Sequence, residues 1–226
     1  MTFLKKAAAL LFILAFSATA AGAAYDGGAL RCVDTSEKVV ALTFDDGPHP
    51  TLTAEILEVL EKYGVRATFF VVGENARYYP DALRMAVSRG HEIGNHTLSH
   101  GALSKKSADE IKAEIAAAED EILSACGVKT KLFRPPEGCV SKSVVRAAKE
   151  LGYEIILWSV DTRDWAHCST ADMVRNIKKN VRPGSVVLFH DYISGAAHTK
   201  AALNVVIPYL LAQGYRFVTV SELINA

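Results

Sequence analysis

The stretch VVALTFDDGP, residues 39–48, joins a continuous apolar run to an abrupt polar end. A short apolar run without alternation is typical of a strand buried on both faces, as in a parallel sheet. Asp45 and Asp46 follow this run at once, and Gly47-Pro48 then turns the chain. Read alone, Asp-Asp-Gly-Pro is also an ordinary turn. The stretch nevertheless places two carboxylates at the carboxyl end of a predicted buried strand.

Six further apolar runs follow along the chain, and amphipathic stretches separate them. The runs cover residues 67–72, 92–95, 131–134, 154–160, 185–190 and 215–220. The stretches predict helices over residues 53–63, 80–89, 107–126, 141–151, 169–180 and 199–213, the last with a kink at Pro208. Alternating strands and helices predict an α/β fold with a parallel sheet. No glycine-rich phosphate loop follows any run, which favours a seven-stranded (β/α) barrel and predicts no nucleotide cofactor.

The composition is that of one ordinary globular domain. The chain has 226 residues, of which 50% are hydrophobic and 22% charged, with 25 basic and 25 acidic residues. This composition excludes a disordered or collagen-like chain. The absence of a basic excess predicts that no nucleic acid is a partner. We expect a monomer.

The N-terminus has the pattern of a secretory signal peptide. Lys5 and Lys6 precede the apolar run 7–16, and small residues fill 17–24. We predict a signal peptide over residues 1–24, cleaved near Ala20 or Ala23, an N-terminal extension over 25–35 and a catalytic domain over 36–226. Cleavage would leave 23 basic against 25 acidic residues. The alternative is an uncleaved membrane anchor, the one case in which membrane contact is expected.

Polar residues gather at the carboxyl ends of five predicted strands. They are Asp45-Asp46, His96 with His100, Arg134 in Arg-Pro-Pro-Glu-Gly, Asp161 and Asp164 before Trp165, and His190. Each of these groups alone could also be an ordinary structural feature, such as a turn, a rigid loop or a polar surface. In a barrel the carboxyl ends of all strands meet at one mouth, so together these residues predict an active site there.

Residue types at this mouth indicate a metal site. Asp46, His96 and His100 offer one carboxylate and two imidazoles, a usual ligand set for a catalytic first-row cation. We expect one divalent metal ion, with Zn²⁺ first and Co²⁺, Ni²⁺ or Mn²⁺ as alternatives. A cation in such a site acidifies bound water. The same ligand set also suits a non-haem Fe(II) oxygenase, which stays an alternative.

The remaining polar residues suit proton transfer. Asp45 is the predicted base, oriented by Arg134 through a bidentate pair. His190 is the predicted acid, tuned by Asp164. A metal site, a base and an acid together predict the hydrolysis of an amide or ester.

The sequence resembles the polysaccharide deacetylases of the NodB homology type, carbohydrate esterase family 4. Five motifs of that family occur in order: TFDDGP at 43–48, HTLSH at 96–100, RPPEG at 134–138, DTRDW at 161–165 and LFH at 188–190. The resemblance implies a deformed (β/α)₇ barrel and the same roles for the metal ligands, base and acid. It also implies a substrate site of Pro136, the Glu137 backbone N–H as oxyanion donor, and Trp165 and Leu188 around the acetyl methyl group. Position 137 departs from the family, where an aromatic residue, commonly Tyr, is frequent.

The resemblance implies a secreted enzyme that removes acetyl groups from N-acetylated sugars of a polysaccharide, with cell-wall peptidoglycan as the first candidate. O-deacetylation of xylan, deacetylation of chitin or an exopolysaccharide, and a non-catalytic carbohydrate-binding protein are the alternatives. We expect an extracellular or cell-wall-associated location, or the periplasm in a host with two membranes. Whether the sugar is N-acetylglucosamine or N-acetylmuramic acid stays open.

The predicted topology suggests how the four cysteines pair. Cys139 and Cys168 follow neighbouring strands at the mouth, whereas Cys32 and Cys126 belong to the opposite end. We therefore predict the disulfides Cys139–Cys168 and Cys32–Cys126, with four free, buried thiols as the alternative.

Overall fold

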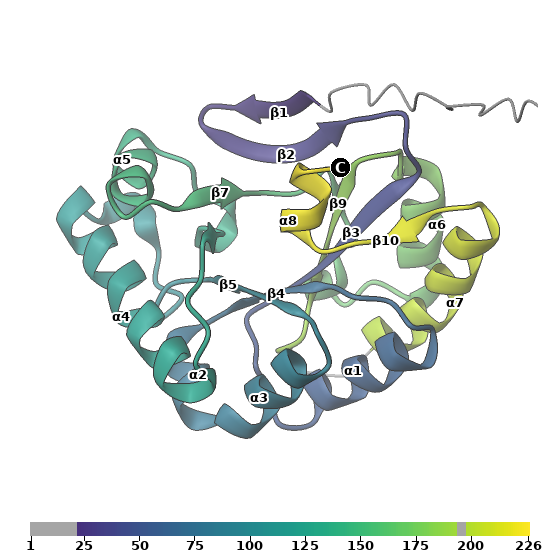
Figure 1. The fold of residues 1–226 in the computed structure, drawn as a ribbon, viewed down its shortest axis with the longest axis horizontal. Helices are drawn as coiled ribbons and strands as arrows, with labels where there is room; N and C mark the ends of the chain where they lie inside the picture. Colours follow the sequence, from purple (N-terminus) through teal and green to yellow (C-terminus); the bar gives the residue numbers. More distant parts are fainter. Residues whose placement is uncertain (1–21, 194–197) are drawn as a thin grey trace, which may run out of the picture.

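Strand β3 (Val39–Asp45), which contains the opening apolar run, is buried along its whole length and pairs in parallel with β4 and β9. The computed structural model describes residues 22–193 and 198–226. In this part of the chain the strands follow the order β2-β7-β6-β5-β4-β3-β9, and a pairing of β2 with β9 closes the ring (Figure 1). The predicted seven-stranded (β/α) barrel is confirmed.

The other strands of the sheet are short. They are β1 (Gly22–Asp26), β2 (Ala29–Asp34), β4 (Thr68–Val71), β5 (Glu92–Asn95), β6 (Leu132–Phe133), β7 (Glu154–Ile156), β8 (Val160–Asp161), β9 (Ser185–His190) and β10 (Arg216–Phe217). Strand β8 extends the sheet beside β9, and β10 pairs with the start of β3.

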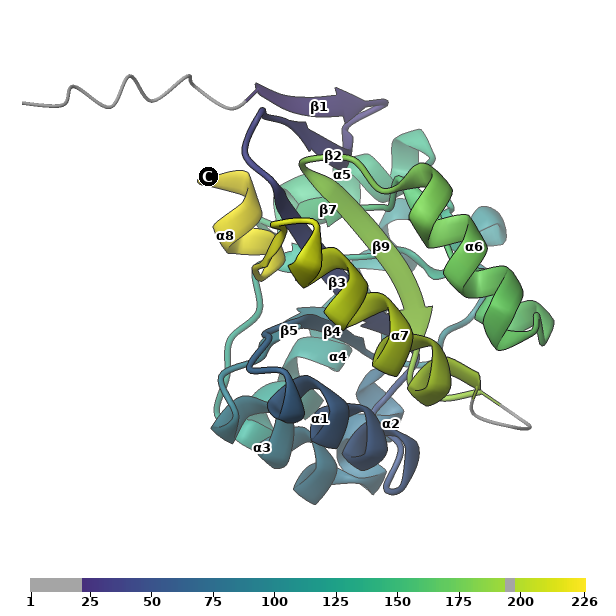
Figure 2. The same ribbon diagram turned by 90° about the vertical axis from the view of Figure 1, so that its right-hand side faces the viewer.

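Helices lie on the outer side of the ring, except the C-terminal one, which lies across one end of the barrel (Figures 1 and 2). They are α1 (Leu52–Lys62), α2 (Gly73–Tyr78), α3 (Pro80–Ser88), α4 (Ala108–Cys126), α5 (Lys142–Glu150), α6 (Thr170–Asn180), α7 (His198–Ala212) and α8 (Val220–Ile224), with short 3₁₀ helices η1 (Leu103–Lys105), η2 (Pro136–Gly138) and η3 (Asp164–Ala166). Local sequence sets their ends: Ser107 and Glu110 form a capping box at α4, and Gly127 ends that helix in the left-handed conformation. The six predicted helices are confirmed within a few residues.

The two faces of β3 contact different parts of the molecule. Its outward residues Val40, Leu42 and Phe44 belong to a core cluster that reaches α1, α6 and α7. Its inward side changes along the strand, from Val39 and Ala41 to Thr43 and Asp45. The lower part of the barrel is therefore apolar, and its carboxyl end is polar.

Two predicted strands have different boundaries in the structure. The run 154–160 is split into β7 and β8, because Leu157 N–H donates to Leu30 on β2 whereas Ser159 N–H donates to Val186 on β9. The run 215–220 ends early, because Thr219 and Glu222 form a capping box that starts α8. Helix α8 packs its apolar side on the inner barrel cluster and covers its amino end.

The N-terminal boundary needs a correction. Residues 25–35, predicted as an extension, include β2, which pairs in parallel with β7 and contacts β9. The barrel therefore begins before residue 36. Of the predicted signal peptide, residues 1–21 lie outside the described residues, and residues 22–24 belong to β1. Within the described residues, no helix is both long and apolar enough to cross a membrane.

Neither predicted disulfide forms. All four cysteines are free thiols and partly buried. Cys139 packs against the cluster beneath α4 and α5, whereas Cys168 packs against the cluster beneath α6 and α7. The Cys126 thiol donates to the Ile122 carbonyl within its own helix. The prediction treated loops at the same end of the barrel as neighbours, although their side chains enter different clusters.

Candidate active site

A pocket of about 470 Å³ opens at the carboxyl ends of the barrel strands. The strand register places two of its residues side by side, since Asp45 at the end of β3 pairs with His190 at the end of β9. The residues that line the pocket are Asp45, Asp46, His96, His100, Glu137, Trp158, Asp161, Trp165, Leu188 and His190. The structure thus brings residues from all five predicted strand ends together.

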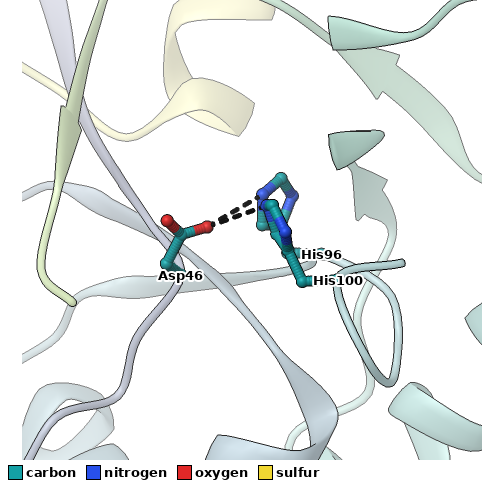
Figure 3. Close-up of side chains that lie close together, drawn as sticks. All are labelled: Asp46, His96 and His100. Atoms are coloured by element: carbon teal, nitrogen blue, oxygen red, sulfur yellow. Dashed lines mark ion pairs between the residues drawn. The ribbon is translucent and has the colours of Figure 1, made fainter. Parts of the chain in front are cut away.

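Three side chains converge on one point of this pocket, as Figure 3 shows. Oδ1 of Asp46 lies 3.3 Å from Nε2 of His96 and 3.2 Å from Nε2 of His100. One possible ligand atom from each residue lies within 4.8 Å of the other two. The trio has the spacing of a single-ion site.

The chemistry of the trio fits a divalent cation. Nδ1 of His96 lies 2.6 Å from the Arg134 carbonyl oxygen, which only accepts, so Nδ1 carries the proton and Nε2 presents its lone pair to Asp46. Among the described residues, Oδ1 of Asp46 is buried without a hydrogen-bond partner. Lone pairs of a carboxylate and an imidazole that face each other need a positive charge between them, which a bound metal ion would supply and a proton on the imidazole supplies otherwise.

The imidazoles also govern the protonation of Asp46. Burial acts to raise the pKa of Asp46, but the rings of His100 and His96 outweigh it and lower this pKa below its usual range. Asp46 in turn raises the pKa of His100. The carboxylate is therefore ionised near neutral pH, as a metal ligand must be.

Arg134 holds Asp45 from the barrel interior, where both side chains are buried. Its Nη1 donates to Oδ1 of Asp45 at 2.6 Å. Its Nε and Nη2 instead donate to the carbonyl oxygens of Ile156 and Leu157, at 3.1 and 3.0 Å. The predicted bidentate pair is therefore wrong. Only one carboxylate oxygen is held, and Oδ2 lies 3.8 Å from Nε2 of His96.

His190 is paired with Asp164, which is buried. Nδ1 of His190 lies 2.8 Å from Oδ1 of Asp164, and the His190 backbone N–H donates to Oδ2 at 2.8 Å. The Thr199 hydroxyl also donates to Oδ2, at 3.0 Å. Burial acts to lower the pKa of His190, but Asp164 outweighs it and raises this pKa to about 9. A protonated imidazole therefore lines the pocket near neutral pH.

Three of the four residues predicted around the substrate, Glu137, Trp165 and Leu188, line the pocket. The fourth, Pro136, is buried in η2 and is not among the lining residues. Its ring starts the 3₁₀ turn that carries Glu137, whose backbone is left-handed with φ of +57°.

Sequence reasoning missed Trp158 as part of the pocket. Trp158 lies in the bend between β7 and β8, and a side chain on Gly138 would come within 2.9 Å of its ring. The only sequence feature that pointed to Trp158 was its position, as a large aromatic residue near the end of an apolar run. Asp161 was singled out but given no role, and its Oδ1 accepts from the Trp165 indole N–H at 3.3 Å.

Fold and pocket together define a barrel enzyme of the hydrolase class, with proton-transfer groups on neighbouring strands beside a possible metal site. Comparison with known proteins agrees. The model of the polysaccharide deacetylase family matches residues 33–156. A peptidoglycan-N-acetylglucosamine deacetylase of Bacillus cereus is 41% identical over 195 residues, which cover 85% of this chain and 91% of that protein.

Solved structures agree as well. The Bc1960 peptidoglycan N-acetylglucosamine deacetylase has a TM-score of 0.81 and 38% identity, covering 84% of this chain and 90% of that one. A family 4 acetyl xylan esterase from Clostridium thermocellum, in complex with a cobalt ion, has a TM-score of 0.77 and 36% identity, covering 83% and 91%. This chain belongs to the polysaccharide deacetylase family, carbohydrate esterase family 4, and the resemblance found in its sequence is confirmed.

Proposed function

We propose that this chain is a metal-dependent deacetylase that removes the N-acetyl groups of N-acetylglucosamine in cell-wall peptidoglycan and releases acetate. The observation that carries the proposal is the placement of Asp45 and His190 in register on neighbouring strands, beside the trio of Asp46, His96 and His100. Hydrolysis of an amide needs a base, an acid and charge stabilisation within one pocket. The Bacillus cereus relative supports the choice of peptidoglycan.

Asp46, His96 and His100 would hold one divalent cation. When bound, Zn²⁺, or Co²⁺, Ni²⁺ or Mn²⁺ in its place, supplies Lewis-acid chemistry that polarises the acetyl carbonyl and makes water more acidic. The cobalt ion in the Clostridium thermocellum structure supports a first-row metal. The hydrogen bond from His96 Nδ1 to the Arg134 carbonyl keeps the ligand nitrogen turned to the pocket.

Two residues move protons. Asp45 accepts the proton of the attacking water at Oδ2, because Arg134 occupies Oδ1. His190 donates a proton to the leaving amine from Nε2, because Asp164 holds Nδ1. The reaction then transfers one proton from water to base and one from acid to amine, which leaves acetate and a free amino sugar.

Three pocket residues bind the acetyl group. The Glu137 backbone N–H donates to the oxyanion of the tetrahedral intermediate. Trp165 and Leu188, which line the pocket, enclose the acetyl methyl group. Trp165 is 51% exposed, which leaves its ring available to a sugar.

Export belongs to the same proposal. Cleavage of the predicted signal peptide after Ala20 or Ala23 would place the domain, as a monomer, outside the cytoplasmic membrane, where peptidoglycan lies. Mass spectrometry of the protein recovered from the culture medium or cell wall tests this. An N-terminus at residue 21 or 24 is expected, and an intact Met1 would contradict cleavage.

Acetate release tests the activity. The purified mature chain is loaded with Zn²⁺ and given peptidoglycan, chitooligosaccharides and acetylxylan. We expect release to be fastest from peptidoglycan. Faster release from chitooligosaccharides or acetylxylan would show that the substrate is one of these alternatives and not peptidoglycan. Glycan binding without release in any metal would instead support a binding protein, and oxygen consumption with a 2-oxo acid would support an oxygenase.

Asp164→Asn should shift the alkaline limb of the pH profile to lower pH. His190 must be protonated to act as the acid, so with its pKa raised to about 9 activity is present below that pH and is lost as pH rises through it. Without the Asp164 charge, burial remains and lowers the pKa, so activity is lost at lower pH. Values of kcat/KM from about pH 5 to about pH 10 measure this limb. Asp172→Asn, which removes an exposed carboxylate paired with Arg175, is the control and should leave the limb in place.

Glu137→Gln should relax discrimination against acidic sugars. Glu137 is exposed at the mouth and helps to raise the pKa of His100, and none of the described lining residues is Lys or Arg. A carboxylate near the acetamide should therefore be repelled, by a few-fold in rate and less in high salt. The kcat/KM ratio for glycans with and without a free lactyl carboxylate, at low and high salt, measures the effect. A ratio that is unchanged in the variant would contradict it.

A further inference from the structure

The backbone of Asp46 has an unusual conformation. Its φ is +76°, in the left-handed region that few residues besides glycine, asparagine and aspartate adopt. The conformation still costs energy in aspartate, and such residues gather at functional sites, where neighbouring groups hold them.

One residue contacts the backbone on both sides of Asp46. The Asp191 N–H donates to the Asp45 carbonyl at 3.0 Å. Oδ1 of Asp191 accepts from the Gly47 N–H, also at 3.0 Å. A third bond comes from α2, where the Asn75 side-chain N–H donates to the Asp46 carbonyl at 2.7 Å. The peptide groups before and after Asp46 are thus held by two residues.

Asp191 is built into this position. Its side chain is buried, and its second oxygen, Oδ2, accepts from the Thr53 hydroxyl at 2.6 Å. A side chain on Gly47 would place its Cβ 2.1 Å from the same oxygen, so the carboxylate occupies the space that a residue other than glycine would need. The proposed mechanism has no use for this buried acid.

Asp191 also connects the loop that carries Asp46 to the strand that carries His190, the proposed catalytic acid. Asp191 directly follows His190 at the end of β9, which pairs with β3 along six residue pairs. The Thr53 hydroxyl that binds Asp191 also accepts from the His49 N–H at 2.7 Å. The loop 46–53 is thereby tied to the strand that carries His190.

We propose that Asp191 is a positioning residue that holds the metal ligand Asp46 in its left-handed conformation, with Asn75 as its partner on the other side. The proposal rests on the proposed metal-dependent function. Without the carboxylate, the Gly47 N–H loses its acceptor, the loop relaxes, and the Asp46 carboxylate turns away from His96 and His100. Loss of such an outer partner lowers metal affinity by about 10- to 100-fold.

Zinc affinity of the whole chain is the test, measured by competition with a chelator in the absence of substrate. Asp191→Ala should bind Zn²⁺ about 10- to 100-fold more weakly than the wild type. Asp191→Asn, which keeps an oxygen for the Gly47 N–H, should restore most of the affinity. The melting temperature of the metal-free protein, measured in parallel, reports folding separately.

A partly buried carboxylate elsewhere provides the control. Glu119 accepts from the Thr130 N–H at 3.0 Å and the Tyr153 hydroxyl at 2.7 Å, outside the pocket. Glu119→Gln should lower the melting temperature without changing zinc affinity. If Asp191→Ala does not fold, Asn75→Ala and Thr53→Val take its place, and each should weaken zinc binding.

The outcomes separate the two proposals. A folded Asp191→Ala variant with wild-type zinc affinity would overturn the role of Asp191, as would unchanged affinity in both replacement variants. A wild-type protein that binds no Zn²⁺ and releases no acetate would instead overturn the proposed function.

Discussion

Replacing Asp45 by Asn should abolish most deacetylase activity while zinc binding is kept. Asn has the same shape and can still accept the Arg134 hydrogen bond at Oδ1, but its second group cannot take a proton from water. General base catalysis contributes about 10²- to 10⁴-fold in rate, so kcat should fall by about that factor. Acetate release at saturating Zn²⁺, together with zinc affinity, measures the two effects separately.

The same substitution should lower stability, and this must be controlled. Arg134 is completely buried and would lose its counter-charge. Removing one partner of a buried ion pair reduces the free energy of unfolding by about 3–5 kcal/mol, and less where the replacement still accepts a hydrogen bond. Activity is therefore compared well below the melting temperature of the variant. A variant that is folded, zinc-loaded and within about tenfold of wild-type activity would show that Asp45 is not the base.

Asp46→Ala is the second substitution with a large expected effect, and it should abolish zinc binding. Asp46 is the proposed ligand that both imidazoles face, so its removal should weaken zinc binding by more than the roughly 100-fold expected for an outer partner. Activity should fall with it at any attainable zinc concentration. Chelator competition and acetate release across a zinc titration measure both.

The stability of the metal-free protein gives a separate readout for Asp46→Ala. The rings of His100 and His96 stabilise the ionised Asp46 more than burial penalises it, so removing the carboxylate should lower the melting temperature of the metal-free protein. Alanine also tolerates the left-handed backbone less well than aspartate, which adds to this loss. Asp46→Asn keeps that tolerance and is the matched control. Full zinc affinity in either variant would remove Asp46 from the ligand set.

The strand ends were the most predictable part of this molecule. A short apolar run that stops at a polar residue marks a buried strand and its carboxyl end, and the barrel geometry then brings those ends together. For this reason Asp45, Asp46, His96, His100 and His190 could be assembled into one pocket from the sequence.

Other features depend on pairings that no local pattern reveals. The bend at Trp158 exists because the chain changes partner from β2 to β9. The single contact between Arg134 and Asp45 follows from the backbone carbonyls that this bend supplies to the guanidinium. Asp191 was visible beside His190, but its contacts with Asp45 and Gly47 come from a strand far away in sequence.

The closure of the ring by β2 has a consequence for the order of assembly. Among the seven strands of the ring, β2 comes first in the chain, but its partners come late: Ala29 pairs with Ile155 and Cys32 with Ser185. During synthesis the ring therefore stays open, with unpaired strand edges, until residue 185 has emerged. An N-terminal fragment can contain Asp46, His96 and His100 and still lack a closed barrel around them. Until the barrel closes, these exposed strand edges can pair with other chains, so closure must come before such association.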